Sequence, residues 1–178
     1  GSVLSAGLGQ GVIRPASIGA GIPAEVPAYG LNMVCGSGMK AVMNGYADRV
    51  AEEADVVLAG GTESMSNAGC VMGGGLRGGN KMGNVLAVDH MVNDGLTDAF
   101  NNYHMGITAE NVAEKHGISR EEQDTFSYSS QQKAIRAVDS CVFKNEITPV
   151  EIAGRKETVV FVTDEHPNTP STLAKLAQ

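Results

Sequence analysis

The residue best suited to covalent chemistry is Cys35, in the run Val34-Cys35-Gly36-Ser37-Gly38. It follows a segment expected to be a strand and precedes one expected to be a helix. The start of a helix carries roughly half a positive charge and unpaired N–H groups, and therefore stabilises a thiolate. Such a thiolate suits acyl transfer, and glycines beside it leave room for N–H groups to face an oxyanion. The alternative is a small buried apolar side chain, as most free cysteines are.

The spacing of apolar residues predicts the elements that hold Cys35. Residues 26–34 alternate loosely after a proline and favour a strand, while residues 36–53 have the spacing of a helix. Residues 54–59 form a continuous apolar run that ends in two glycines, which is typical of a buried strand. Strand, helix and strand in this order predict a βαβ unit with a right-handed crossover.

Outside that unit the pattern predicts helices, a glycine-rich excursion and a pair of strands. Ser119 and Glu122 have the spacing of a capping box, in which each side chain bonds the backbone N–H of the other residue. The expected helices cover 13–18, 106–115 and 119–141, and a short amphipathic stretch covers 173–176. The flexible or hairpin-like excursion covers 69–83, and the strands cover 147–152 and 158–162.

Composition excludes several classes of protein. The formal net charge of -7 argues against a general nucleic-acid binder, which would need a basic face. No apolar run is long enough for a membrane helix, and no signal-peptide pattern is present. Three cysteines without a CxxC pair argue against a disulfide framework or a metal site, so we expect no metal and a cytoplasmic location.

Several motifs together give the chain a family resemblance. In order, they cover residues 32–41 around Cys35, 59–66, 95–100, 103–111, 119–123 and 164–167. Taken together they resemble the thiolase family, the acetyl-CoA acetyltransferases. The match is collinear and extends over essentially the whole chain, which is far more specific than any single motif.

The resemblance implies an α/β fold: an incomplete half of a layered thiolase-like core, with an α+β excursion called the loop domain. Residues 1–66 would form the partial core that carries the nucleophile. Residues 67–178 would be mostly the loop domain that binds coenzyme A, including an excursion at 76–83 through which family members form tetramers. A mobile solvated loop is the alternative for 76–83. A homo-oligomer, dimer or tetramer, is therefore expected.

The resemblance also implies a reaction. One acetyl-CoA acylates Cys35, and a second, once deprotonated, attacks the acetyl group to give acetoacetyl-CoA; thiolysis is the reverse. No tightly bound cofactor is expected, since coenzyme A is part of the substrate. His104 and Met105 match family positions that line the pantetheine and acyl end of the pocket, and Leu96 matches a position near the same channel. His104 taken alone is more often a satisfied surface or core histidine.

Two departures from the family pattern stand out. Asn168 falls where several thiolases carry an arginine that helps hold the nucleotide end of coenzyme A. Family members also carry a first strand and helix before Gly1, and a second core half after Gln178 with a histidine that activates Cys35 and a second cysteine that acts as acid and base. We therefore expect a fragment with little turnover of its own.

Three other functions remain open from the sequence. The parent protein could be a degradative thiolase for longer 3-ketoacyl-CoA substrates, or the chain could be a non-catalytic module that binds coenzyme A or acyl groups on the same core. A ketoacyl synthase is a further cysteine-dependent condensing enzyme. The segments Tyr103–Gly106 and Gly60–Ser66 favour a thiolase over it.

Overall fold

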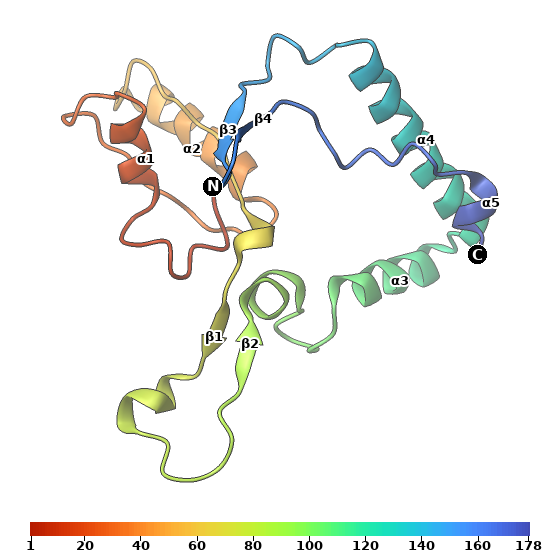
Figure 1. Cartoon of the computed structure of the whole chain (residues 1–178), viewed down its shortest axis with the longest axis horizontal. Helices are drawn as coiled ribbons and strands as arrows, with labels where there is room; N and C mark the ends of the chain where they lie inside the picture. Colours follow the sequence, from red (N-terminus) through yellow and green to blue (C-terminus); the bar gives the residue numbers. More distant parts are fainter. The chain divides into compact units, whose positions relative to one another are not determined.

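The computed structural model describes all residues, 1–178 (Figure 1). They form two compact units, residues 1–108 and 109–178. Each unit is described by itself. The boundary predicted after residue 66 separates a core from a loop domain that binds coenzyme A. The two compact units are defined by contacts instead, so they do not test that boundary, and it stays a prediction.

The first unit combines helical segments with one hairpin. The helices predicted over 13–18 and 36–53 are confirmed as α1 and α2. In chain order the elements are α1 (Ile13–Gly19), α2 (Ser37–Val50), η1 (Met65–Asn67), β1 (Cys70–Met72), η2 (Gly74–Gly78), β2 (Ala87–Asp89), the π-helix η3 (Met91–Leu96) and the first residues of α3 (Met105–His116).

Strands β1 and β2 pair antiparallel, with Cys70 opposite Asp89 and Met72 opposite Ala87. The glycine-rich chain between them contains η2 and forms the end of the hairpin, as Figure 1 shows. The prediction of a hairpin-like excursion over 69–83 is therefore confirmed, and the hairpin leads directly into η3 through His90.

The two strands predicted beside α2 are wrong. Residues 26–34 and 54–59 form no strand, and Val56 and Leu58 are 88% and 86% exposed. A strand exists only where a neighbouring segment completes its hydrogen-bond ladder, and apolar composition cannot supply that neighbour. The βαβ unit is therefore absent as regular structure.

The segment 54–59 still lies along α2, at a close contact between backbone and side chain. Gly45 of α2 is buried, and a Cβ atom built on it would stand 2.8 Å from Cγ1 of Val57. Only glycine allows this approach without a shift of Val57.

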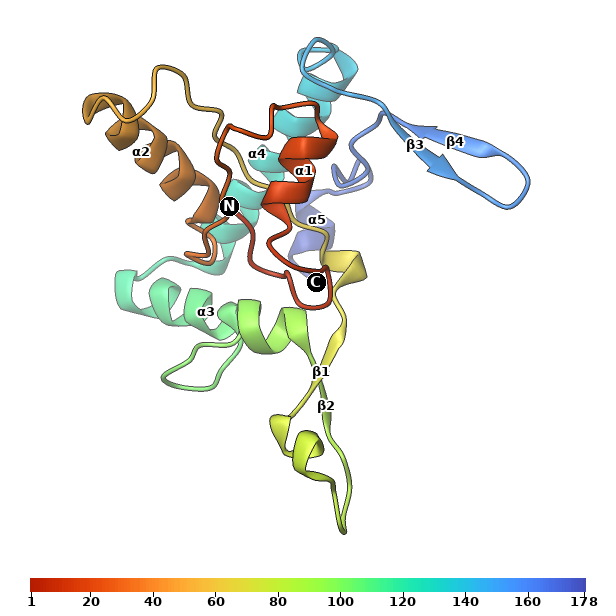
Figure 2. The same ribbon diagram turned by 90° about the vertical axis from the view of Figure 1, so that its left-hand side faces the viewer.

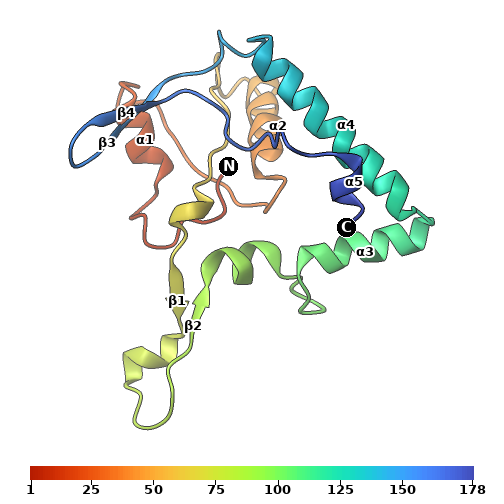
Figure 3. The ribbon, with the colours of Figure 1, turned by 45° about the vertical axis from the view of Figure 1, so that its right-hand side comes forward.

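The second unit contains the rest of α3, then α4 (Arg120–Asp139), β3 (Val150–Ala153), β4 (Thr158–Phe161) and α5 (Leu173–Leu176). The helices predicted over 106–115 and 119–141 and the strands predicted near 147–152 and 158–162 are confirmed, and the amphipathic stretch 173–176 forms α5. Helix α5 lies beside the first turn of α4, where the Arg120 guanidinium donates a hydrogen bond to the carbonyl oxygen of Leu176 (Figure 3).

Strands β3 and β4 form an antiparallel hairpin in which Val150 lies opposite Phe161 and Ile152 opposite Val159 (Figure 2). Every residue of both strands is exposed. The fold class of the whole chain is thus mixed helix and strand. No helix is both long enough and apolar enough to span a membrane.

Candidate active site

Cys35 lies in a tight turn that runs directly into α2. Its thiol is exposed, and Gly36, the next residue, is the N-cap of the helix. The backbone N–H of Gly36 donates to the Met33 carbonyl at 3.1 Å, and that of Ser37 donates to the Val34 carbonyl at 3.1 Å. These two bonds fold the chain back on itself at the cysteine.

The first turn of α2 leaves donors free in front of this turn. The backbone N–H of Lys40 bonds the Gly36 carbonyl at 2.8 Å, whereas the N–H groups of Gly38 and Met39 have no acceptor within the chain. Unpaired N–H groups at a helix start attract negative charge. The arrangement therefore can stabilise an anion that forms on or next to the Cys35 sulfur.

Val34 has an unusual backbone conformation. Its φ of 48° lies in the left-handed region, which a β-branched residue avoids. The Asn32 side-chain oxygen accepts a hydrogen bond from the Val34 N–H at 2.9 Å. The residue immediately before Cys35 is thus held in a conformation that it would not adopt without support.

Glycines allow the N-terminal segment to cross over the start of α2. A Cβ on Gly1 would stand 2.5 Å from the backbone carbon of Ser37 and 2.6 Å from the Gly38 nitrogen. A Cβ on Gly61 would stand 3.2 Å from the Gly1 oxygen. The backbone of Gly1 therefore packs against the start of α2 more closely than a side chain would allow, and a Cβ on Gly61 would fit only if Gly1 gave way by a few tenths of an ångström.

The Glu63 carboxylate fixes the same segment. It accepts hydrogen bonds from the backbone N–H groups of Val3 at 2.7 Å and Leu4 at 2.8 Å. On its other side, Ser2 donates its N–H to the Leu31 carbonyl at 3.2 Å. Residues 1–4 are thereby held between Glu63 and the stretch of chain that leads to Cys35.

The three residues predicted to line the pocket lie close together at one junction. Thr97 and His104 form an isolated antiparallel bridge, and the Asp98 N–H donates to the Tyr103 carbonyl at 2.8 Å. This pairing brings Leu96, the last residue of η3, beside His104, the residue before α3, and Met105, its first residue. Leu96 and Met105 are half-buried, and His104 is exposed with its Nδ1 accepting from the Gly106 N–H at 3.1 Å.

The turn between Leu96 and His104 is organised by the Asp98 carboxylate. It accepts hydrogen bonds from the backbone N–H groups of Asn101 and Phe100, both at 2.8 Å. These bonds, that from Asn101 first, hold the pKa of Asp98 below its ordinary value. Hydrogen bonds to the ionised form favour it, so the carboxylate and the turn support each other.

Helix η3, which ends at Leu96, is braced by a buried histidine. His90 is 6% exposed and its Nδ1 lies 2.7 Å from Oδ2 of Asp94, while its Nε2 has no partner. Hydrogen bonds from the Asn93 side chain and then from His90 lower the pKa of Asp94. The Leu4 side chain packs 3.7 Å from the position of a Cβ on Gly95, so residues 1–4 contact η3 as well.

The structure therefore groups Leu96, His104 and Met105, and no hydrogen bond joins them to Cys35. Residues 1–4 contact the chain on both sides of this gap. Ser2 bonds Leu31, in the stretch that leads to Cys35, and Leu4 contacts Gly95 of η3. No group of three or more His, Cys, Asp or Glu side chains is arranged to hold a metal ion. The roles predicted for the four residues stay predictions.

Sequence reasoning did not single out Glu63, His90 or Asp94. The sequence held one usable signal, the carboxylate of Glu63 shortly after two glycines. Contacts separated by some 60 residues, such as that between Glu63 and Val3, leave no local pattern to find.

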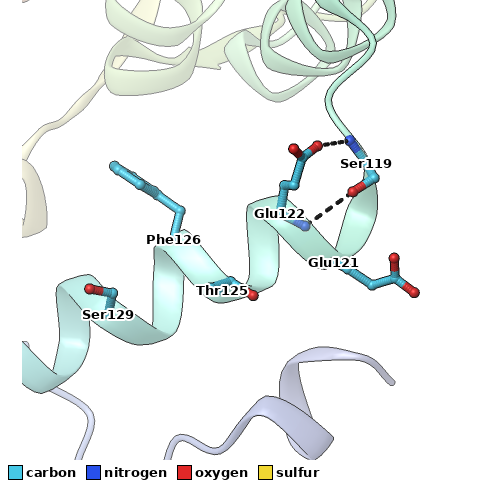
Figure 4. Close-up of a pocket in the computed structure, with 6 residues that line it drawn as sticks. All are labelled: Ser119, Glu121, Glu122, Thr125, Phe126 and Ser129. Atoms are coloured by element: carbon cyan, nitrogen blue, oxygen red, sulfur yellow. Dashed lines mark hydrogen bonds between the residues drawn. The ribbon is translucent and has the colours of Figure 1, made fainter.

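The second unit has pockets of its own. One is a shallow hollow on the first turns of α4, where Figure 4 shows the confirmed capping box: Glu122 N–H donates to the Ser119 hydroxyl at 3.2 Å, and Ser119 N–H donates to the Glu122 carboxylate at 2.8 Å. Around the other, the Asn168 N–H donates to the Gln131 side-chain oxygen at 2.8 Å. Asn168, the residue that departs from the family pattern, thus lines a pocket.

Comparisons with known proteins agree on the family. Residues 1–178 match the family described as "Thiolase, N-terminal domain". An acetyl-CoA acetyltransferase of Pseudomonas aeruginosa is 52% identical over 179 residues, which cover 100% of this chain and 45% of that protein. An acetyl-CoA acetyltransferase of Syntrophomonas wolfei is 50% identical, over 99% of this chain and 46% of that protein.

The likeness extends to three dimensions. The crystal structure of the Bacillus anthracis acetyl-CoA acetyltransferase superposes with a TM-score of 0.92 at 34% identity, over 99% of this chain and 44% of that chain. The chain spans about half the length of the curated relatives it matches. Because the family match covers every residue and the structural likeness covers nearly all of them, this chain belongs to the thiolase family.

Proposed function

We propose that the protein carrying this chain is an acetyl-CoA C-acetyltransferase that works through an acetyl-Cys35 intermediate. Family membership and the names of the relatives support the reaction class. The observation that carries the assignment is the exposed Cys35, one residue ahead of the N-cap of a helix whose first turn has free backbone N–H groups.

In the first step the Cys35 thiolate attacks the carbonyl carbon of acetyl-CoA. A new carbon–sulfur bond forms, the bond between the carbonyl carbon and the sulfur of coenzyme A breaks, and coenzyme A leaves as a thiolate that takes up a proton. Negative charge builds up on the carbonyl oxygen on the way, which favours a site with preorganised N–H donors. The product is a thioester and is itself a good acyl donor.

In the second step another acetyl-CoA loses a proton from its methyl group. The resulting carbanion attacks the acetyl carbon on Cys35, a carbon–carbon bond forms, and the Cys35 thiolate is released with acetoacetyl-CoA. Thiolysis is the reverse. We assign the activating histidine and the acid/base cysteine, which the family resemblance implies, to the part of the relatives that this chain does not cover.

Leu96, His104 and Met105 would receive the pantetheine and acyl end of the substrate. Their proximity at the η3–α3 junction supports that role. The remainder of coenzyme A would contact residues 67–178, with neutral Asn168 near its nucleotide end. The protein would act as a homo-oligomer, and its three free cysteines suit the reducing cytoplasm.

The experiment is a thiolysis assay of the protein carrying this chain, with acetoacetyl-CoA and a series of longer 3-ketoacyl-CoA substrates. We expect the highest kcat/KM with acetoacetyl-CoA and loss of turnover in Cys35→Ser, with Cys141→Ser as the matched control. Faster thiolysis of the longer substrates would replace the proposal with a degradative thiolase. Binding of coenzyme A without thiolysis of any substrate would replace it with a binding module.

A further inference from the structure

We propose that Ser37 is a positioning residue for Cys35, because its buried hydroxyl holds Val34, the residue immediately before the cysteine, in a left-handed conformation at the start of α2. The inference deepens the proposed function and rests on it only for the role of Cys35 as nucleophile. Ser37 does not touch the substrate in this account; it acts through the backbone on both sides of Val34.

The Ser37 hydroxyl bonds the turn twice. Its Oγ accepts a hydrogen bond from the Met33 N–H at 2.9 Å and donates one to the Val34 carbonyl at 2.6 Å. The residue is 4% exposed, so water cannot replace either partner. Because Ser37 is also the first residue of α2, both bonds tie the turn to the rigid helix.

These bonds oppose a local strain. A β-branched residue disfavours the φ of 48° observed at Val34, and such conformations persist only where neighbouring contacts impose them. The Val34 N–H is held by Asn32, and the Val34 carbonyl is held by both the backbone N–H and the hydroxyl of Ser37. Without the hydroxyl, the carbonyl keeps one of its two bonds and the Met33 N–H loses its acceptor.

The conformation of Val34 determines where Cys35 points, because the two residues share a peptide bond. With Val34 left-handed, Cys35 lies directly before the N-cap Gly36. Relaxation of Val34 to an ordinary negative φ would change the orientation of Cys35 relative to α2, in whose first turn the N–H groups of Gly38 and Met39 are free. The thiolate would lose the favourable field of the helix start, and its reactivity would fall.

The chain itself supplies the controls for a test. All three cysteines, Cys35, Cys70 and Cys141, are exposed, so iodoacetamide labels them in one sample and peptide mass spectrometry gives each rate. Ser37→Ala removes both hydrogen bonds of the hydroxyl, to the Met33 N–H and to the Val34 carbonyl. We expect labelling of Cys35 to slow at least about tenfold relative to Cys70, since each bond of ordinary net strength is worth roughly 1 kcal/mol. Ser37→Thr keeps the hydroxyl and should restore most of that loss.

A double variant separates positioning from simple packing. Glycine reaches a positive φ without strain, so in Val34→Gly the left-handed conformation no longer needs the hydrogen bonds of the Ser37 hydroxyl. In the Val34→Gly background, adding Ser37→Ala should slow iodoacetamide labelling of Cys35 by less than about threefold. The effects of the two substitutions would then not add, as is usual for residues in contact. Ser140→Ala is the matched control, because the Ser140 hydroxyl also donates to a carbonyl, that of Arg136, at 2.6 Å.

An unchanged ratio of Cys35 to Cys70 labelling in Ser37→Ala would overturn the proposal, and so would losses of equal size with and without Val34→Gly. If Ser37→Ala does not fold, Ser37→Thr and the double variant Val34→Gly/Ser37→Ala decide. A folded double variant whose Cys35 is labelled about as fast as in Val34→Gly supports the positioning role of Ser37. Loss of Cys35 labelling in the double variant contradicts that role. If the labelling rate of Cys35 depends on Ser37 as expected but no acetyl group is transferred, only the proposed function is contradicted.

Discussion

The substitution Glu63→Gln tests how the N-terminal segment is held against the site. Glu63 is the acceptor for the backbone N–H groups of Val3 and Leu4, at 2.7 and 2.8 Å. Glutamine keeps one acceptor oxygen and puts an NH2 group in place of the other, so one of the two bonds is lost and two donors are brought together. Leu4, whose N–H makes one of these two bonds, is among the few buried apolar residues, at 7% exposure.

The size of the effect follows from these contacts. A hydrogen bond from a backbone N–H to a carboxylate contributes roughly 1.5–3 kcal/mol when buried. Because Glu63 itself is exposed, solvent screens part of this, and we expect a loss of about 1–2 kcal/mol in the free energy of unfolding. For a chain of this size that lowers Tm by roughly 2–8 °C.

Two measurements check the prediction. Thermal unfolding gives the change in Tm, and amide hydrogen exchange shows whether the N–H groups of Val3 and Leu4 lose protection. Glu25→Gln is the matched control, because Glu25 is exposed and its side chain makes no hydrogen bond. Equal Tm values for the two variants, with protection of Val3 and Leu4 retained, would refute the account of this contact.

Three further predictions concern single contacts. Ser119→Ala removes one half of the capping box of α4 and should lower the free energy of unfolding by about 1 kcal/mol, measured by urea denaturation against Ser130→Ala on the same helix. The hydrogen bonds from the backbone and then the side chain of Ser119 lower the pKa of Glu122, so the stability they add is present above the ordinary glutamate pKa of about 4.3 and is lost as pH falls through the lower folded pKa. Circular dichroism should therefore show helix loss on acidification that is smaller in Glu122→Gln; an identical acid profile would contradict this. Gly1→Ala places a Cβ against backbone atoms of α2 and should destabilise the fold by about 1–3 kcal/mol, whereas Gly38→Ala meets open space and should not; equal Tm values for these two would count against the close packing.

Helices were predictable from sequence because their signals are local. The capping residues Ser119 and Glu122, which located α4, lie three positions apart, and apolar spacing within one segment located α2. The hairpins β1–β2 and β3–β4 were also predictable, since each pairs segments close in the chain.

Strands that need distant partners were not predictable in this way. Residues 54–59 are apolar enough for a buried strand, yet Leu58 is 86% exposed because no neighbouring strand pairs with the segment. The composition of a segment indicates only that it favours burial. Whether it forms a β-strand depends on which other segment lies beside it and pairs with its backbone.

The candidate site was predictable in part for the same reason. The motif around Cys35 and the pair His104 and Met105 are visible in the sequence. The left-handed Val34 and the two bonds of the Ser37 hydroxyl are not, because valine is a residue that propensity would never place at positive φ.

The most direct test of the central claim is to incubate the protein carrying this chain with acetyl-CoA alone and to locate the acetyl group by peptide mass spectrometry. The account predicts one acetyl group as a thioester on Cys35, removed by added coenzyme A and absent in Cys35→Ser. Acetylation of Cys70 or Cys141 at the same rate as Cys35, or none on Cys35, would contradict it.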